Sequence, residues 1–387
     1  MENYEYIIVG AGIAGSVLAN KIANEKNKKV LIIEQRNHIA GNCFDYHNEK
    51  GILIHKYGPH IFHTNDKKVW EYLSQFTKWR EFQLELKCNI NGKNVPLPFN
   101  LNTLREIFPD TLADEYEALL LKEYKYDTLV PILKLKESKI EKIRELADFI
   151  YEKVYLNYML KQWGLKPEEI DKSVTERVPI AISKDDRYFK DYYQALPLHG
   201  YTEIFNNMLS NSNINILLNT KADELIEIKN NKIYFSGKEF KGTLIYTGQI
   251  DELLSFKYGD LPYRTLRFEF ETFKLEQFQE APVVSYPNNY DFTRITEYKL
   301  LTGQDSSYTT IGKEFPMAYD RFDPSQDTPY YPIPGQENRG KYAKYKDDLK
   351  EVKNLILVGR LAEYMYYNMD MITKRALDIY ETQIKDK

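Results

Sequence analysis

Cysteine is scarce in this chain of 387 residues, which contains only Cys43 and Cys88. Small folds built on disulfides carry many more cysteines, so a disulfide scaffold is not expected. Two isolated thiols fit a reducing compartment, and the expected location is cytoplasmic.

Long apolar runs and an excess of charge of one sign are also missing. No run of about 18 apolar residues is present, so we expect no membrane insertion. No basic leader precedes the first apolar run, at Tyr6, so no signal peptide is expected. The formal net charge of −4 gives the whole chain no electrostatic attraction for nucleic acid or an anionic membrane. An anionic ligand would therefore need a local group of Arg and Lys side chains.

Tyrosine, by contrast, is abundant, with 32 residues. Its ring is apolar and its hydroxyl is polar. Two interpretations remain open: compositional drift in a chain rich in Lys, Asn, Ile and Tyr, or a groove lined with phenol hydroxyls that suits sugar and phosphate.

The first forty residues predict a β-α-β unit. Residues 4–9 have the composition of a buried parallel strand, 14–24 that of a helix and 30–33 that of a second strand. Gly10-Ala11-Gly12-Ile13-Ala14-Gly15 lies between the first strand and the helix, where a G-x-G-x-x-G sequence predicts dinucleotide binding.

Each glycine of that motif has a physical purpose in such a fold. Gly10 permits the tight turn, Gly12 lets the backbone approach a pyrophosphate, and Gly15 permits close helix–strand contact. Glu34, at the end of the second strand, is placed to accept hydrogen bonds from a ribose 2′-hydroxyl.

Additional glycine turns favour FAD over NAD. Gly41 and Asn42 closely follow Glu34, and two later apolar strands end at Gly248 and Gly359. The extended FAD molecule needs more backbone contacts than NAD does, so FAD is the expected cofactor.

The remaining patterns are mixed. The Asn91-Gly92 pair predicts a β-hairpin of residues 87–97. Residues 103–164 are mostly helical in pattern, with capping boxes predicted at Thr103/Glu106 and Ser138/Glu141 and a long helix that ends at Gly164. Residues 260–320 alternate as in an antiparallel sheet, and 355–358 and 368–385 predict a last strand and a last helix.

The expected fold class is therefore α/β: a Rossmann-like FAD-binding domain with an inserted helical domain and an antiparallel β-sheet domain. A chain of this length usually forms more than one domain. The expected boundaries are 1–80, 200–252 and 345–387 for the discontinuous FAD-binding domain, 100–165 for the helical domain, and 81–99, 166–199 and 253–344 for the sheet and substrate domain.

Four segments together resemble the UDP-galactopyranose mutases of bacteria: Ala40-Gly41-Asn42, Tyr57-Gly58-Pro59-His60-Ile61-Phe62-His63-Thr64, Lys161-Gln162-Trp163-Gly164 and Gly359-Arg360-Leu361. The resemblance covers nearly the whole chain. It implies a homodimer with non-covalent FAD, active when reduced, that interconverts UDP-galactopyranose and UDP-galactofuranose for cell-surface polysaccharides. The implied mechanism is attack of the reduced flavin N5 on the anomeric carbon, loss of UDP, ring opening of the iminium, and reclosure without net redox change.

The resemblance also implies the site residues. Arg177 and Arg294 match two arginines that bind the diphosphate, where a guanidinium suits the charge of the leaving group. Arg360 matches an arginine beside the flavin, and His60 a histidine against its ring system, where protonation could tune reactivity. The implied substrate-binding residues are Tyr158, Trp163, Tyr188, Ser285, Tyr331, Tyr366 and Asn368. The implied cofactor-binding residues are Gly10, Gly12, Gly15, Glu34, Gly41, Asn42, His60, Gly359 and Arg360.

His60 and His63 also form an H-x-x-H pattern, with His55 nearby. A zinc site usually needs three or four ligands of defined geometry. No supporting carboxylate pattern is present, so no metal site is expected.

Three positions depart from the family's pattern. Met159 stands where many members have Thr, Ser285 stands near a common Asn, and Asn368 stands where bacterial members usually have Asp. Loss of that negative charge beside Arg360 changes the local electrostatics and leaves the sugar open. UDP-galactose is the expected sugar nucleotide, and UDP-N-acetylgalactosamine is an alternative that could be equal or preferred.

Two other functions share the cofactor fold. An amine-oxidase-like flavoprotein would transfer electrons to oxygen and would not need two diphosphate arginines. A non-catalytic binding module could lose its glycines and Glu34, and this chain retains them.

Overall fold

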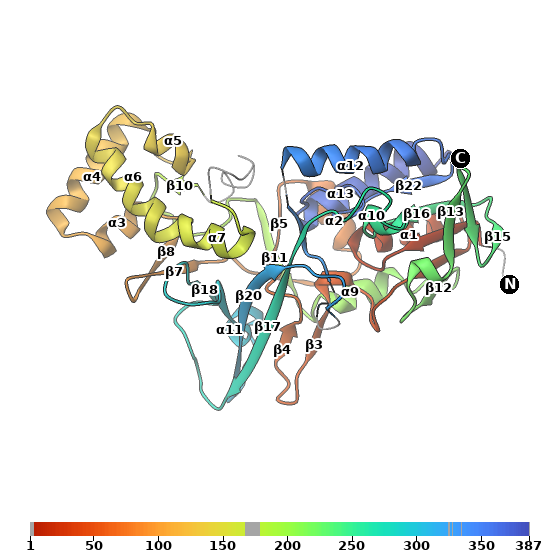
Figure 1. Cartoon of the computed structure of the whole chain (residues 1–387). Helices are drawn as coiled ribbons and strands as arrows, with labels where there is room; N and C mark the ends of the chain where they lie inside the picture. Colours follow the sequence, from red (N-terminus) through yellow and green to blue (C-terminus); the bar gives the residue numbers. More distant parts are fainter. Residues whose placement is uncertain (1–3, 167–178, 324–325, 327, 334, 387) are drawn as a thin grey trace.

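A computed structural model describes residues 4–166, 179–323, 326, 328–333 and 335–386. Figure 1 shows a parallel sheet with its helices at one end, a group of helices at the other, and a large twisted sheet between them. The helices in these ranges are all too short or too polar to cross a membrane.

The parallel sheet contains the β-α-β unit that the sequence predicts. Strand β1 (Tyr6–Val9) is followed by helix α1 (Ile13–Glu25) and by β2 (Val30–Ile33). The sheet continues with β12 (Ile214–Leu217) beside β2, and with β16 (Thr243–Tyr246) and β22 (Leu355–Leu357) beyond β1. The strand order β12-β2-β1-β16-β22 is parallel throughout, so the predicted Rossmann-like fold is confirmed.

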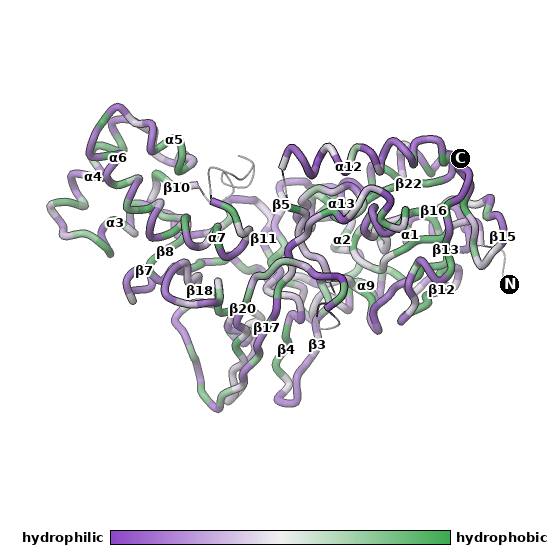
Figure 2. Tube along the Cα trace, in the orientation of Figure 1, coloured by the Kyte–Doolittle hydropathy of each residue, from purple (hydrophilic) through white to green (hydrophobic). Residues whose placement is uncertain are grey.

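Side chains of these strands alternate between two faces. Ile8, Ile32 and Ile245 pack against the helices of one face, α1, α9 (Tyr201–Met208) and α13 (Met369–Ile379). Ile7 and Leu31 pack on the other face, against α10 (Ile250–Leu253), α12 (Gln336–Leu349) and the small sheet of β13 (Ile226–Lys229), β14 (Lys232–Phe235) and β15 (Lys238–Glu239). Figure 2 shows that α12 is mostly hydrophilic, because only its inner side contributes to this core.

The large sheet has seven strands in the order β21-β17-β20-β19-β18-β7-β8. The predicted hairpin is confirmed: β7 (Leu86–Ile90) and β8 (Lys93–Leu97) flank Asn91 and Gly92, both at positive φ. The other strands are β17 (Tyr263–Phe273), β18 (Val283–Ser285), β19 (Arg294–Glu297), β20 (Thr309–Ala318) and β21 (Tyr331–Pro332). All pairs are antiparallel except β7–β18.

Shorter elements connect the two sheets. A three-stranded sheet contains β5 (Phe62–Thr64), β11 (Tyr193–Pro197) and β6 (Trp79–Glu81), and a pair contains β3 (Asp45–His47) and β4 (Leu53–His55). Helix α2 (Lys67–Leu73) follows β5, and α11 (Tyr298–Thr302) follows β19.

The helical group contains α3 (Leu101–Ile107), α4 (Asp110–Glu123), α5 (Ile132–Lys136) and α6 (Glu141–Ile150), with β9 (Leu129–Val130) paired to β10 (Ile180–Ala181). Helix α6 continues through a π-helical segment (Tyr151–Leu156) into α7 (Asn157–Trp163). The predicted long helix and its end are confirmed, since Gly164 adopts φ 71° and donates its N–H to the Leu160 carbonyl. The C-terminal helix also exists, as α13 and a π-helical turn (Tyr380–Ile384).

Both predicted capping boxes are wrong. The box at the start of α3 is formed by Asn100 and Thr103, because Asn100 precedes the helix and Thr103 is already its third residue. Helix α6 begins after Ile140, whose side chain cannot cap it. The Ser138 hydroxyl accepts the Ile140 N–H instead, outside the helix.

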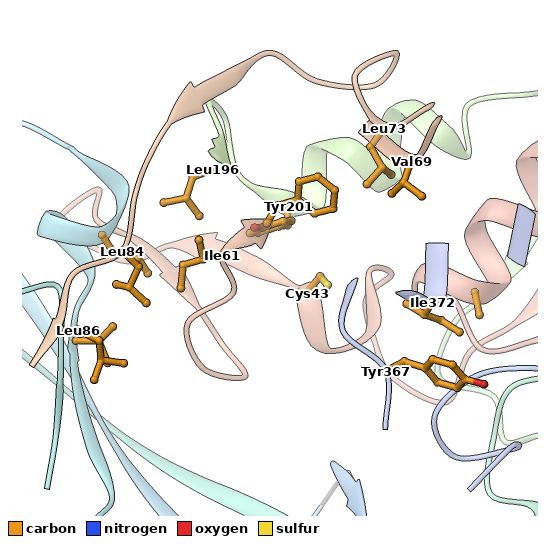
Figure 3. Close-up of a cluster of buried hydrophobic side chains, with 14 of the residues drawn as sticks. Cys43, Ile61, Val69, Leu73, Leu84, Leu86, Leu196, Tyr201, Tyr367 and Ile372 are labelled. Atoms are coloured by element: carbon orange, nitrogen blue, oxygen red, sulfur yellow. The ribbon is translucent and has the colours of Figure 1, made fainter. Parts of the chain in front are cut away.

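One hydrophobic core joins the parallel sheet to the rest of the molecule. Figure 3 shows part of it, running from Leu84 and Leu86 through Ile61 and Tyr201 to Ile372. Because this core is continuous, the carboxyl ends of the parallel strands and the large sheet are held in a fixed relation.

We expect Gly15→Ala to destabilise the fold, because a Cβ there would lie 2.0 Å from the Gly10 carbonyl oxygen. Overpacking of this kind should lower the free energy of unfolding by roughly 1–3 kcal/mol. Gly340→Ala is the matched control: Gly340 lies in α12, and an added Cβ would meet no atom of the described residues within 4 Å. Alanine there should raise the free energy of unfolding by about 0.5–1 kcal/mol. Urea titration measures both, and equal stability of the two variants would contradict the expectation.

Candidate functional site

The first glycine turn is constrained by the protein's own packing. Gly10 has φ 97°, and a Cβ there would lie 2.1 Å from the Thr247 hydroxyl. Gly15 lies directly against the Gly10 carbonyl. Both positions therefore require glycine for internal reasons, whatever the protein binds.

Gly12 is different, because no atom of the described residues requires a glycine there. Its φ is −78°, and the nearest atom to an added Cβ would be the Gly41 Cα at 3.8 Å, an ordinary contact. Gly41 belongs to the second glycine turn, which is joined to the first by the hydrogen bond from Ala40 N to Ala11 O (3.0 Å). The two backbones touch, because a Cβ on Gly41 would lie 2.9 Å from the Gly12 Cα, so a diphosphate would have to lie beside this contact.

Helix α1 starts directly after Gly12. Gly12 has no side chain that could cap the helix, and no acidic residue lies in its first turn. The first N–H groups of α1 and the positive end of its dipole thus have no side-chain cap in the part of the chain that the structure describes. Such a helix start is suited to a phosphate.

Glu34 links the first glycine turn to the end of β2. Its carboxylate is buried and accepts the N–H groups of Ala11 and Arg36, each at 2.9 Å. The sequence predicts a contact with ribose; the structure gives Glu34 this backbone role and leaves each oxygen with further capacity to accept.

Arg36 was missed by the sequence analysis. One of its terminal nitrogens, Nη2, donates to Asn42 (2.9 Å) and Thr328 (2.7 Å), and the guanidinium lies over the ring of Tyr57 at 4.6 Å. The other, Nη1, is buried without a protein acceptor among the described residues. A buried, charged donor without an acceptor is costly, so this nitrogen fits an anionic or polar ligand at the same site. Its position two residues after Glu34 was the available signal.

The last glycine turn adds a second cation. Gly359 has φ 106° and is followed by Arg360. Arg360 donates to the carbonyl oxygens of Tyr330 (3.1 Å) and Tyr367 (2.6 Å). Its guanidinium lies 4.7 Å from the ring centre of Tyr366 and 5.2 Å from that of Tyr331. Arg360 therefore joins the parallel-sheet end to a group of tyrosines.

Arg294, at the start of β19, lies within electrostatic range of Tyr331 and Tyr158. Its Nε and Nη2 donate to one oxygen of Glu314, at 3.0 and 2.7 Å, from the facing position of β20. Burial opposes the charge of Arg294, but Glu314 outweighs this effect, and the pKa of Arg294 rises above its ordinary value. Arg294 is thus permanently cationic. Sequence reasoning missed Glu314, whose position opposite Arg294 depends on strand register.

Two tyrosines near Arg294 are hydrogen-bond donors at neutral pH. Burial raises the pKa of Tyr158 and of Tyr331 to about 12, although nearby Arg294 opposes the rise in both. Tyr331 and Tyr366 are stacked, with ring centres 5.8 Å apart. Tyr188 and Tyr366 both lie within electrostatic range of Tyr158, so four of the predicted tyrosines converge near Arg294.

The other predicted substrate residues lie around this group. Trp163 is buried at the end of α7, with its ring centre 5.8 Å from that of Tyr331. Ser285 is buried in β18, directly opposite Arg294. Asn368 precedes α13, and its side chain caps none of the described N–H groups of that helix. Arg177 lies outside the described residues.

His60 is half-buried and neutral in this structure. Its Nδ1 is 2.9 Å from the Gly58 carbonyl, which can only accept, so Nδ1 carries the proton and Nε2 is left with a lone pair. Burial, His55, Arg360 and Arg294 together lower the pKa of His60 to about 4. His55 is buried behind it and accepts the His60 backbone N–H at 3.1 Å, and burial lowers the pKa of His55 to about 3.

His63 has a separate set of contacts. Its Nδ1 lies 2.9 Å from the Asp191 carboxylate, and its ring stacks on Phe189 at 3.7 Å. Within the described ranges, no three His, Cys, Asp or Glu side chains come together as metal ligands.

Comparison with known families gives two matches. A family model described as UDP-galactopyranose mutase matches residues 153–366, and one described as an NAD(P)-binding Rossmann-like domain matches residues 8–76. The UDP-galactopyranose mutase model spans more than half of the chain and includes α7, the strands β18 and β19 with Arg294, and Arg360.

Individual relatives match over nearly their whole length. UDP-galactopyranose mutase of Mycoplasma pneumoniae is 34% identical, with 97% of this chain and 94% of the relative covered. The Mycoplasma genitalium protein of that name is 37% identical, with 96% and 92% covered. A dTDP-fucopyranose mutase of Escherichia coli is 33% identical, with 98% of each covered. Among solved structures, a reduced UDP-galactopyranose mutase matches with TM-score 0.75 and 16% identity over 100% of this chain and 95% of that chain.

The two neutral histidines predict a pH dependence of stability. A histidine that is neutral when folded but protonates when unfolded makes the unfolded state bind more protons, so stability falls as pH falls from 6.5 towards the folded pKa of about 3 for His55. The effect should approach roughly 1.4 kcal/mol per pH unit for each such histidine. His55→Gln keeps an acceptor for the His60 N–H and should flatten this slope between pH 6.5 and 4.5 in urea titrations. An unchanged slope would show that His55 protonates freely in the folded protein.

Proposed function

Because the chain belongs to the UDP-galactopyranose mutase family, we propose that it is a flavin-dependent isomerase that interconverts UDP-galactopyranose and UDP-galactofuranose. The observation that carries this proposal is the group in which the cations Arg294 and Arg360 lie beside tyrosine hydroxyls. Donors of this kind suit a diphosphate that gains charge as it leaves.

FAD is the proposed cofactor. The first N–H groups of α1, the backbone beside the contact of Gly12 with Gly41, and the Nη1 of Arg36 would hold its diphosphate and adenosine portion, with Glu34 and Asn42 beside them. Gly359, Arg360 and His60 would line the flavin end. When bound and reduced, the flavin supplies the nucleophile for the anomeric carbon of the sugar, in a cycle without net redox change.

The protein's own contribution would be binding, orientation and charge. Arg294, fixed by Glu314, would neutralise the diphosphate as the sugar–phosphate bond breaks, and Tyr158, Tyr188, Tyr331 and Tyr366 would donate to its oxygens. Arg177 is proposed as a second diphosphate arginine from the family resemblance. His60 would present the unprotonated Nε2, so it acts as an acceptor and not as a cation.

Trp163 and Ser285 would form the wall of the sugar and nucleotide pocket, with Asn368 opposite. The proposed sugar is galactose, and two other sugars are candidates. The E. coli relative acts by name on a dTDP-fucose, and it covers this chain as fully as the UDP-galactose relatives do. A 2-acetamido sugar is the other candidate. We further propose a cytoplasmic homodimer that supplies a cell-surface polysaccharide pathway.

The first test is turnover by the dithionite-reduced protein. We expect a yellow protein that takes up FAD and that isomerises UDP-galactofuranose when reduced, with little turnover when oxidised. UDP-galactopyranose, UDP-N-acetylgalactosamine and dTDP-fucopyranose are compared side by side by chromatography of the nucleotide sugars. Equal rates in both redox states would contradict the nucleophile role, and a colourless protein without FAD uptake would contradict the enzyme.

The second test removes the proposed diphosphate cation. Arg294→Ala should lower kcat by about 100–1,000-fold, as does loss of one charged donor at a developing anion, while the flavin spectrum is retained. If the alanine variant does not fold, Arg294→Lys is assayed in its place, because it keeps a positive charge beside Glu314.

Arg267→Ala is the matched control, since Arg267 lies on β17 and pairs with exposed Glu269. It should leave turnover and the Kd for UDP unchanged. Normal turnover of folded Arg294→Ala would remove Arg294 from the site.

A further inference from the structure

The turn between β18 and β19, residues 286–293, accepts three hydrogen bonds from one lysine of α7. The ammonium of Lys161 donates to three of its carbonyl oxygens: Tyr286 at 2.5 Å, Phe292 at 2.9 Å and Tyr290 at 3.0 Å. An ammonium has three donors, so Lys161 is fully used by this turn. The next residue after the turn is Arg294.

Two further contacts connect the same helix to the same turn. The side chain of Asn288 donates to the Lys153 carbonyl (2.7 Å) and accepts from Asn157 (2.6 Å). Lys153 lies in the π-helical segment, and Asn157 and Lys161 lie four residues apart on one side of α7. Tyr158, which is near Arg294, follows Asn157 directly.

The end of α7 is attached to the large sheet as well. Buried Arg264 of β17 donates to the carbonyl oxygens of Gln162 (2.8 Å) and Lys161 (2.7 Å). These are carbonyls at the C-terminal end of α7, where a helix lacks its own donors. The segment that carries Tyr158 and Trp163 is thus fixed to β17 on one side and to the β18–β19 turn on the other.

The hydrogen bonds of Lys161 to the described residues all go to carbonyl oxygens. Burial lowers the pKa of Lys161 to about 8, against a smaller opposite effect of Asp291. Lys161 is half-buried, and three carbonyl oxygens accept the hydrogen bonds of its ammonium. Taking a charge partly out of water to hold a loop is costly. Its position between the segments that carry Tyr158 and Arg294 supplies a functional reason for it.

We propose that Lys161 is a positioning residue for the reaction. It fixes the β18–β19 turn, and with it Arg294, relative to Tyr158 and Trp163 of α7. This inference rests on the proposed function, in which Arg294 binds the diphosphate. Lys161 itself would not touch the substrate, since its three donors are occupied.

The test is Lys161→Met, which keeps most of the side-chain volume and removes the three bonds. We expect kcat/KM for UDP-galactofuranose to fall by about 100-fold, as misplacement by about 1 Å can cause, with a raised Kd for UDP and an unchanged flavin spectrum. The matched control is Lys299→Met. Lys299 is buried and its ammonium also donates to a carbonyl, that of Ser306 (2.7 Å), but it lies in α11. It should lower stability without changing KM or the Kd for UDP.

A rescue experiment separates positioning from general stability. In Lys161→Ala, added propylamine can replace the missing alkylammonium and should restore part of the activity, whereas 1-propanol of equal length should not. If neither lysine variant folds, Asn288→Ala serves as the test. It removes the hydrogen bonds of Asn288 with Asn157 and Lys153 and leaves the Lys161 ammonium in place. It should raise the Kd for UDP several-fold.

The role of Lys161 would be overturned if the wild type is active and folded Lys161→Met keeps the wild-type KM and Kd. The same result in Asn288→Ala would overturn it when the lysine variants do not fold. An inactive wild type would instead refute the proposed function.

Discussion

The contact between α1 and the turn that precedes it sets the geometry on which the site depends. Gly15 lies against the Gly10 carbonyl with no side chain between them, and Gly10 lies against the side chain of Thr247, so the three segments meet closely. The helix start is thereby brought to the carboxyl ends of β1, β2 and β16. The second glycine turn and the Gly359 turn reach the same edge of the sheet. Ligands of open α/β sheets bind at such an edge, because loops from several strands and a helix dipole are available there.

Arg294 and Glu314 compensate each other's charge. Glu314 is almost completely buried, and without Arg294 its carboxylate would be an uncompensated charge. With Arg294 bound to one oxygen, the pair keeps a fixed orientation and leaves part of the guanidinium for a ligand. Burial also keeps Tyr158 and Tyr331 protonated, so they donate hydrogen bonds. A group in which cations and hydroxyl donors predominate is complementary to a diphosphate.

The sequence predicted structural elements that depend on residues close together in the chain. It did not predict side-chain partners that are distant in the chain. The β-α-β unit, the Asn91-Gly92 hairpin and the helix end at Gly164 all arise from local backbone preferences. The capping boxes were wrong because Asn100, and not Thr103, precedes α3, and because Ile140, and not Ser138, precedes α6. Glu314 and the turn held by Lys161 were not foreseen, because their roles depend on strand register and on segments more than a hundred residues apart. The tyrosines occupy two settings: Tyr246, Tyr263 and Tyr345 are core residues, whereas Tyr158 and Tyr331 lie near Arg294.

Fold alone does not distinguish an oxidase from an isomerase. A putrescine oxidase variant shares this fold, with TM-score 0.57 and 12% identity over 98% of the chain. A protonated amine needs a carboxylate or an aromatic cage to bind it. Here the carboxylate paired with Arg294 is that of Glu314, with one oxygen occupied by the arginine and the other buried. Arg360 covers the faces of Tyr331 and Tyr366, where a cation would otherwise bind. A cationic substrate would therefore meet two fixed positive charges, and an anionic nucleotide sugar would be stabilised by both.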